Sequence, residues 1–174
     1  MTADVRVPVV AAGTWVASDC RTRAAFTVRG LTGPVTGTLA LSHGEVEVDA
    51  AGTPRHARAE LDLRTVDTGI TRRDADLRKP SLLDADRRPA MTWSADRFTR
   101  GADGSWTADG VLALRGTSTP LAVRAVPELR DGRLLLRATA TVDRRSVGIR
   151  APRLVIGTEV RIVVEAELAP ARTG

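Results

Sequence analysis

The charged side chains best placed to do chemistry are concentrated in residues 65–93, a polar, charge-paired stretch in a chain that otherwise alternates apolar and polar residues. Arg73 and Asp74 are adjacent here, and Asp143 and Arg144 form a second adjacent pair far along the chain. An arginine can grip a phosphate or carboxylate through two parallel hydrogen bonds, so Arg73 or Arg144 could bind a ligand head group. The same charges could instead form salt bridges and helix caps that fix this stretch to the rest of the fold. Both interpretations predict damage on mutation.

Other kinds of reactive site have little support in the sequence. His43 and His56 are the only histidines and Cys20 is the only cysteine, too few for a closed set of nitrogen and sulfur metal ligands. No serine nucleophile elbow, Cys–His pair or glycine-rich phosphate loop is recognisable. The sequence therefore predicts no catalytic residue, no metal and no cofactor. A reaction that depends only on holding and orienting a hydrophobic substrate would, however, leave no motif.

Alternation of apolar and polar residues recurs along most of the chain and is typical of strands with one buried face. The clearest example is residues 57–64, where Ala and Leu alternate with charged residues. Turn signals separate such segments: Asp131-Gly132 suits a type I′ hairpin, and residues 42–44 and 102–104 also predict turns. A sheet of this many antiparallel strands tends to close on itself, because closure removes exposed edges. The plentiful small aliphatic residues would leave room inside such a barrel.

A short helical insert is predicted where this alternation breaks, at residues 70–89. Thr71 followed by Asp74 approximates a capping box, which predicts that a helix begins there. Pro80 must end that helix, and Pro89 leads into the next strand. Three apolar side chains are available to seat the insert on the sheet as a lid or end-plug: Leu77, Leu82 and Leu83.

Length and composition limit the classes of function. The 174 residues fit one domain, predicted at residues 13–170 after an N-terminal extension of residues 1–12. The net charge of +5 comes from arginines interleaved with acidic residues, which indicates a solvated strand face and not a nucleic-acid interface. No stretch is apolar enough for integral membrane association, and residues 1–12 do not resemble a secretory signal. We therefore expect a cytoplasmic protein.

Three ordered motifs resemble the YceI-like family of lipocalin-like barrels over roughly residues 13–168. The first is V-D-T-G at 66–69, continued by R-D-A-D-L-R at 73–78, L-L-D at 82–84 and R-P at 88–89. The second is G-V-L-A-L-R-G-T-S-T-P-L at 110–121, and the third is V-D-R at 142–144 with G-I at 148–149. This chain has Leu82 and Leu83 where the family usually has two phenylalanines.

The resemblance implies an all-β fold, an antiparallel eight-stranded lipocalin-like β-barrel with a short helical lid inserted at about residues 70–89. It also implies that the barrel interior holds a hydrophobic small molecule (an isoprenoid, quinone or acyl amphiphile) without catalysis, and that a homodimer could form. We therefore predict a protein that binds, sequesters or carries such a molecule. Two alternatives stay open: a reaction-chamber enzyme acting on a hydrophobic biosynthetic intermediate, and an interaction domain with a filled core.

The candidate ligand-binding residues fall into two groups. Apolar strand faces supply the candidates for the inner wall: Trp15, Phe26, Trp93, Leu112, Leu114, Leu136, Val142 and Ile149. The insert and the charged motifs supply the others: Arg73, Leu77, Leu82, Leu83 and Arg144. Trp106, which follows the turn at 102–104, is expected to pack at a strand end. A register slip of one residue would invert which strand face points inward.

Overall fold

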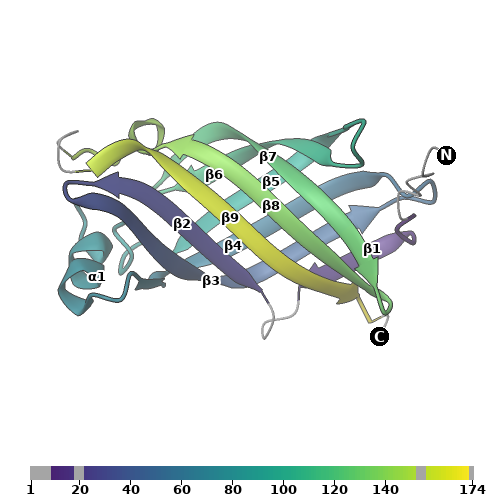
Figure 1. Cartoon of the computed structure of the whole chain (residues 1–174), viewed down its shortest axis with the longest axis horizontal. Coiled ribbons are helices and arrows are strands. Elements are labelled where there is room, and N and C mark those ends of the chain that lie inside the picture. Colours follow the sequence, from purple (N-terminus) through teal and green to yellow (C-terminus); the bar gives the residue numbers. More distant parts are fainter. Residues whose placement is uncertain (1–8, 18–21, 152–155, 173–174) are drawn as a thin grey trace.

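The computed structural model describes residues 9–17, 22–151 and 156–172, in which nine strands form one antiparallel sheet closed into a barrel (Figure 1). The strands are β1 (Gly13–Ala17), β2 (Arg23–Gly30), β3 (Gly33–Val48), β4 (Pro54–Asp67), β5 (Ala90–Arg100), β6 (Trp106–Leu114), β7 (Thr117–Arg130), β8 (Arg133–Asp143) and β9 (Ile156–Pro170). A helix, α1 (Thr71–Arg78), follows β4, and a 3₁₀ helix, η1 (Arg144–Val147), follows β8. Cys20 lies outside the described residues.

The ring has eight strand positions, because β1 and β2 share one position between β3 and β9. On β3, β1 pairs with residues 45–48 and β2 with residues 33–39. On β9, β1 pairs with residues 168–170 and β2 with residues 156–165. Pairing of β3 with β4 closes the ring. The predicted eight-stranded antiparallel barrel with one short helix is therefore confirmed.

Two of the three predicted turns are present. Asp131 and Gly132 both have positive φ, 52° and 74°, and join β7 to β8 as the type I′ hairpin that their sequence favours. Residues 102–104 turn between β5 and β6. The turn predicted at residues 42–44 is wrong, because these residues lie inside β3. The β3–β4 ladder shifts its register between Leu41 and His43, so a bulge absorbs the irregular residues without reversing the chain.

The predicted insert lies between β4 and β5 and sits at one end of the barrel (Figure 1). Its helix starts at Thr71 and stops two residues before Pro80, as predicted. The predicted capping box is wrong, because Ile70 occupies the N-cap and makes no side-chain cap bond. The Asp74 carboxylate instead accepts bonds from the backbone N–H (2.9 Å) and hydroxyl (2.6 Å) of Thr68. Asp74 thus anchors the helix to the end of β4, because both donors face it across the turn.

Both helices are short, with eight residues in α1 and four in η1. Over the ranges that the structure describes, no helix combines the length and the apolar character needed to cross a membrane.

Two packed apolar clusters lie inside the barrel, one toward each end. The helix-end cluster lies beside the insert and η1, and its buried members are Ala24, Leu61, Leu63, Ala85, Met91, Leu112, Leu114, Leu121, Val142 and Val147. The β1-end cluster lies at the opposite end, where β1 begins and β9 finishes, and its buried members are Val10, Trp15, Val48, Leu134 and Leu168. Ala85 from the insert is fully buried, so the insert is packed into the end of the barrel as a plug.

Candidate functional site

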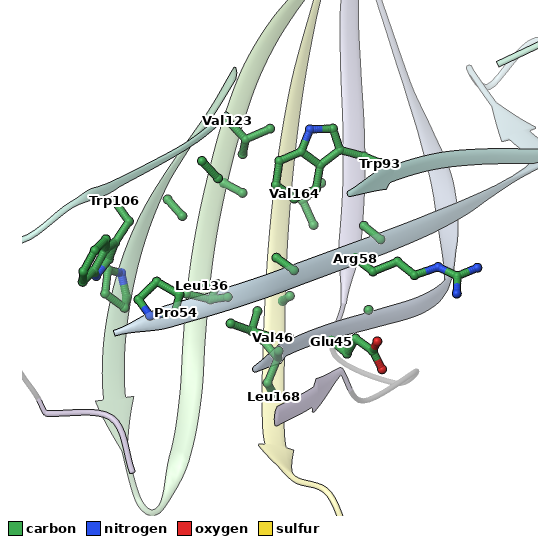
Figure 2. A pocket seen from close by; sticks show the side chains of 18 of the residues that line it. Glu45, Val46, Pro54, Arg58, Trp93, Trp106, Val123, Leu136, Val164 and Leu168 are labelled. Carbon is green, nitrogen blue, oxygen red and sulfur yellow. The ribbon is translucent and has the colours of Figure 1, made fainter. Parts of the chain in front are cut away.

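An internal cavity of about 240 Å³ lies between the two clusters (Figure 2). Its wall includes Leu61 and Leu112 of the helix-end cluster and Val48 and Leu134 of the β1-end cluster. Nearly all of the lining residues are apolar, which is typical of a site for a small hydrophobic ligand. The cavity therefore begins beside the helix-end cluster and extends past residues of the β1-end cluster.

The cavity exists because the wall carries alanine at positions where a filled barrel would carry larger side chains. The strand alanines that line it are Ala17, Ala57, Ala59, Ala108, Ala125, Ala138, Ala140 and Ala166. Ala125 on β7 pairs with Ala138 on β8, so two of these short side chains lie next to each other across the ladder. A methyl group at each of these positions leaves space that the surrounding strands cannot collapse to fill.

Trp93 lines the cavity and packs against the helix-end cluster. Its indole lies against Gly110 on β6, where an added Cβ would come within 2.5 Å of the ring. The indole Nε1–H donates to the carbonyl of Leu121 at 3.0 Å. Because this bond satisfies the only polar atom of the ring, Trp93 presents an apolar surface to the cavity.

The cavity reaches the molecular surface at the β1 end. Its lining there includes Val9, whose side chain is 78% exposed, together with Phe98, Trp106 and the exposed Arg100. No residue of the fully described insert, 70–89, lines the cavity. A ligand would thus gain access from the end opposite the helix.

Among the residues that the structure describes, three charged side chains border the cavity, and two of them have a polar partner within 4 Å. Glu45 lies 3.1 Å from the Nε2 atom of His43, and Arg58 lies 3.6 Å from the carboxylate of Glu60. In Figure 2 the side chains of Glu45 and Arg58 point away from Trp106. The third residue, Arg100, has its guanidinium 6.0 Å from the centre of the Trp106 ring, and no carboxylate in the described ranges forms an ion pair with it.

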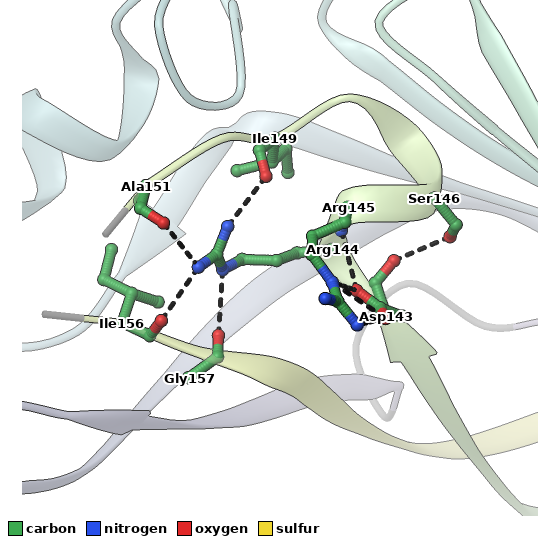
Figure 3. Close-up of polar contacts among 8 residues, drawn as sticks. All are labelled: Asp143, Arg144, Arg145, Ser146, Ile149, Ala151, Ile156 and Gly157. Carbon is green, nitrogen blue, oxygen red and sulfur yellow. Dashed lines mark hydrogen bonds and ion pairs between the residues drawn. The ribbon is translucent and has the colours of Figure 1, made fainter. Parts of the chain in front are cut away.

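Arg144 lies at the helix end and is enclosed by backbone oxygen atoms (Figure 3). It is 3% exposed, and its guanidinium donates to the carbonyls of Gly157 (2.9 Å), Ile149 (2.8 Å), Ala151 (2.8 Å) and Ile156 (2.9 Å). Four of the five N–H groups of the side chain are used in this way. Arg144 therefore ties η1 and the residues after it to the start of β9.

Asp143, immediately before Arg144, caps η1 by accepting a bond from the backbone N–H of Arg145 at 2.9 Å. The Arg145 guanidinium also bonds this carboxylate, with Nη2 at 2.6 Å from Oδ2. Hydrogen bonds from the Arg145 side chain, and then from its backbone, lower the pKa of Asp143 to about 2.

Three further arginines at the helix end also donate to backbone oxygen atoms. Arg73 bonds the hydroxyl (2.8 Å) and the carbonyl (3.0 Å) of Thr68. Arg115 bonds the carbonyls of Gly148 and Pro80, both at 3.1 Å, and Arg88 bonds the carbonyl of Arg115. These three arginines and Arg144 form a set of latches that hold the insert and η1 on the barrel.

A sequence model of the YceI-like domain matches residues 15–168. The chain belongs to the YceI-like domain family. No curated protein sequence matches it.

The solved structures most informative for this YceI-like chain share its barrel at low sequence identity. BcnA of Burkholderia cenocepacia is 13% identical with a TM-score of 0.77, over 87% of this chain and 98% of BcnA. A polyisoprenoid binding domain from Saccharophagus degradans is 15% identical with a TM-score of 0.66, over 92% of this chain and 99% of that domain. A YceI protein of Campylobacter jejuni is 17% identical with a TM-score of 0.66, over 80% and 86% of the two chains. At these identities the similarity shows the fold.

The candidate residues chosen from the sequence fall in different parts of this YceI-like barrel. Three of them line the cavity: Trp93, Leu112 and Leu136.

The other candidates lie outside the cavity. Trp15 packs in the β1-end cluster, with its indole N–H bonded to the carbonyl of Ala11 at 3.0 Å. Leu114, Val142, Leu83 and Ile149 belong to the helix-end cluster or pack against it, and the ring of Phe26 lies against Gly37. Leu77 and Leu82 are half-buried in the insert. Ligand contact by the residues outside the cavity stays a prediction.

The sequence prediction did not name Arg100 or Phe98 as site residues. It placed most of the wall alanines on apolar strand faces, and Arg115 within a family motif, without assigning them a role in the site. It assigned Trp106 to a strand end, and Trp106 is indeed the first residue of β6, but it also lines the cavity. A usable signal existed, because Trp106 shares its strand parity with Leu112 and must face the same side of the sheet.

Proposed function

We propose that this YceI-like barrel binds a hydrophobic small molecule of isoprenoid, quinone or acyl type in the cavity, and that it sequesters or carries that molecule. The cavity between the two clusters, with its almost wholly apolar wall, supports the proposal. Each buried CH₂ of a ligand tail contributes about 0.8 kcal/mol, so the wall alone can provide useful affinity. The similarity of the fold to a domain described as polyisoprenoid binding is consistent with this class of ligand.

The proposed route of access is through the β1 end. Arginine–carbonyl latches hold the insert at the other end, and Ala85 and Val147 are almost fully buried there. The β1 end offers the exposed lining residues Val9 and Arg100. A carrier that loads at this end can keep its plug in place through every cycle of binding and release.

A cytoplasmic location and a homodimer complete the proposal, and they stay predictions from the sequence and from the family resemblance. Cell fractionation and light scattering of the purified protein test them separately from ligand binding.

The proposal is tested by native mass spectrometry of the protein as purified, followed by organic extraction and mass analysis of the released material. We expect a bound hydrophobic molecule in the wild type and its loss in Ala138→Leu, because the larger side chain occupies the cavity. Ala122→Leu is the matched control, since Ala122 is exposed on the outer face of β7. An added hydrophobic fluorophore provides a second test, because the wild type should take it up and Ala138→Leu should not. A bare protein mass together with no such difference in uptake would overturn the proposal.

A further inference from the structure

We propose that the ligand is an anionic amphiphile whose carboxylate or phosphate head group is held at the cavity mouth by Arg100, with its tail directed inward toward Trp93. This inference rests on the proposed function, because it assumes that the cavity is occupied. It adds the class of head group, the direction of insertion and the residue that selects for charge.

The position of Arg100 places a cation where the cavity meets solvent. Arg100 is the last residue of β5 and pairs across the ladder with Trp106, the first residue of β6. Both residues line the cavity, and the guanidinium lies 6.0 Å from the centre of the indole ring. A contact with the face of the ring favours a position of the cation near the opening and does not use the guanidinium N–H groups, which can therefore donate to a ligand.

The acidic group closest to Arg100 in the chain does not neutralise it. Asp103 accepts bonds from the hydroxyl (2.6 Å) and backbone N–H (3.1 Å) of Ser105 and from Arg124 (2.6 Å). These bonds, with the Ser105 hydroxyl first, lower the pKa of Asp103 to about 2, so this carboxylate is ionised and already committed to its own partners. Within the described ranges Arg100 forms no ion pair, which leaves its charge available to a ligand.

The interior of the cavity gives a head group no comparable partner. The indole N–H of Trp93 is already bonded to Leu121, and the wall around it consists of aliphatic side chains such as Ala138, Ala140 and Val164. A charged head group placed there would lose its hydration without a compensating bond. The charge must therefore stay at the mouth, where an arginine can bind two oxygen atoms of a carboxylate or phosphate at once.

The arginines at the helix end cannot provide this contact. Arg144 has four of its N–H groups on carbonyls, and Arg73 and Arg115 are bonded to Thr68, Gly148 and Pro80. None of these three lines the cavity. The head-group role that the sequence suggested for Arg73 or Arg144 is better met by Arg100.

The test compares three probes with the same tail: dodecanoate, dodecyl phosphate and the neutral dodecanol, titrated calorimetrically into wild type, Arg100→Gln and Arg97→Gln. Arg97 is an exposed arginine on the same strand that does not line the cavity, so it is the matched control. We expect the wild type and Arg97→Gln to bind at least one anionic probe about ten-fold more tightly than dodecanol. We expect Arg100→Gln to reduce that affinity to the level of dodecanol and to leave dodecanol binding unchanged.

The two anionic probes separate the possible sources of the head group. Preference for dodecanoate indicates a fatty carboxylate, and preference for dodecyl phosphate indicates an alkyl or prenyl phosphate. Equal affinity of the wild type for all three probes, or an anionic preference that survives in Arg100→Gln, would overturn the inference while the proposed function stands. If none of the three probes binds, the inference fails. The proposed function fails as well only if the native mass spectra show bare protein and no hydrophobic fluorophore is taken up.

Discussion

The helix end and the β1 end of this barrel contain the same residue type in opposite roles. At the helix end Arg144 is 3% exposed and donates to four carbonyls, whereas at the β1 end Arg100 is exposed and lies over the ring of Trp106. A guanidinium whose N–H groups are bonded to the backbone fixes the chain, and one without such bonds can bind an incoming anion. Burial and bonding partners, and not residue type, therefore separate a structural arginine from a ligand-binding one.

Removing the central latch should have the largest effect. Arg144→Met leaves four enclosed carbonyls without a donor, and each buried unsatisfied group is costly, so we expect the free energy of unfolding to fall by about 3 kcal/mol or more. Urea unfolding measures this loss. The neighbouring Arg145→Met is the control. The Arg145 side chain is exposed and, among the described residues, bonds only Asp143, so its loss should be much smaller. Equal losses of unfolding free energy in the two variants would show that the four carbonyl bonds of Arg144 do not hold the helix end together.

Truncation of a core leucine should cost more at the helix end than at the cavity. Leu63 is 1% exposed in the helix-end cluster, so Leu63→Ala should lower the free energy of unfolding by about 3 kcal/mol. Leu136 lines the cavity and lacks neighbours on that side, so Leu136→Ala should cost about half as much. Both values come from urea unfolding of the empty protein. If Leu136→Ala lowered the free energy of unfolding more than Leu63→Ala does, side chains would have to pack around Leu136 in solution and the cavity would be absent.

Stability should fall in acid through one aspartate at each end. The pKa of Asp143 and that of Asp103 are each lowered from 3.8 to about 2 by hydrogen bonds in the folded state. A pKa that is lower in the folded state means that the ionised carboxylate stabilises the folded state. This stabilisation is complete above about pH 4 and is lost as the pH falls toward 2. Thermal unfolding between these pH values should show a shallower decline in Asp143→Asn and in Asp103→Asn than in wild type. A decline as steep in both variants as in wild type would contradict the assignment.

The smallest change in stability should come from Arg100. Because its side chain is exposed and has no ion pair in the described ranges, Arg100→Gln should alter the free energy of unfolding by no more than about 0.5 kcal/mol. Thermal unfolding without ligand checks this. A marked destabilisation would place Arg100 among the structural arginines and remove the contrast between the two ends.

The sequence predicted the fold well because the information for it is local. Apolar and polar residues alternate along each strand, and Asp131-Gly132 favours the left-handed φ values that its hairpin requires. The register of β3 escaped prediction, because a bulge near residues 41–43 changes strand parity through contacts with β4 that no local pattern encodes.

The candidate site was harder to predict, and the location of the family motifs explains why. The latches at the helix end contain four residues of the family motifs: Arg73, Arg88, Arg115 and Arg144. The family resemblance therefore predicted the barrel and its plug but not the cavity. The cavity instead arises from missing volume, at alanines spread over strands that only closure of the ring brings together. No spacing along one strand reveals such a space.

The central claim is that the β1 end, and not the plugged helix end, receives the ligand. A crystal structure of the protein with a bound anionic amphiphile such as dodecanoate tests it most directly. We expect the tail to lie against Ala125 and Ala138, the head group to lie within hydrogen-bond distance of Arg100, and the insert at residues 70–89 to stay unmoved. A ligand seated between the insert and the strands, with Arg144 drawn away from its four carbonyls, would contradict the account.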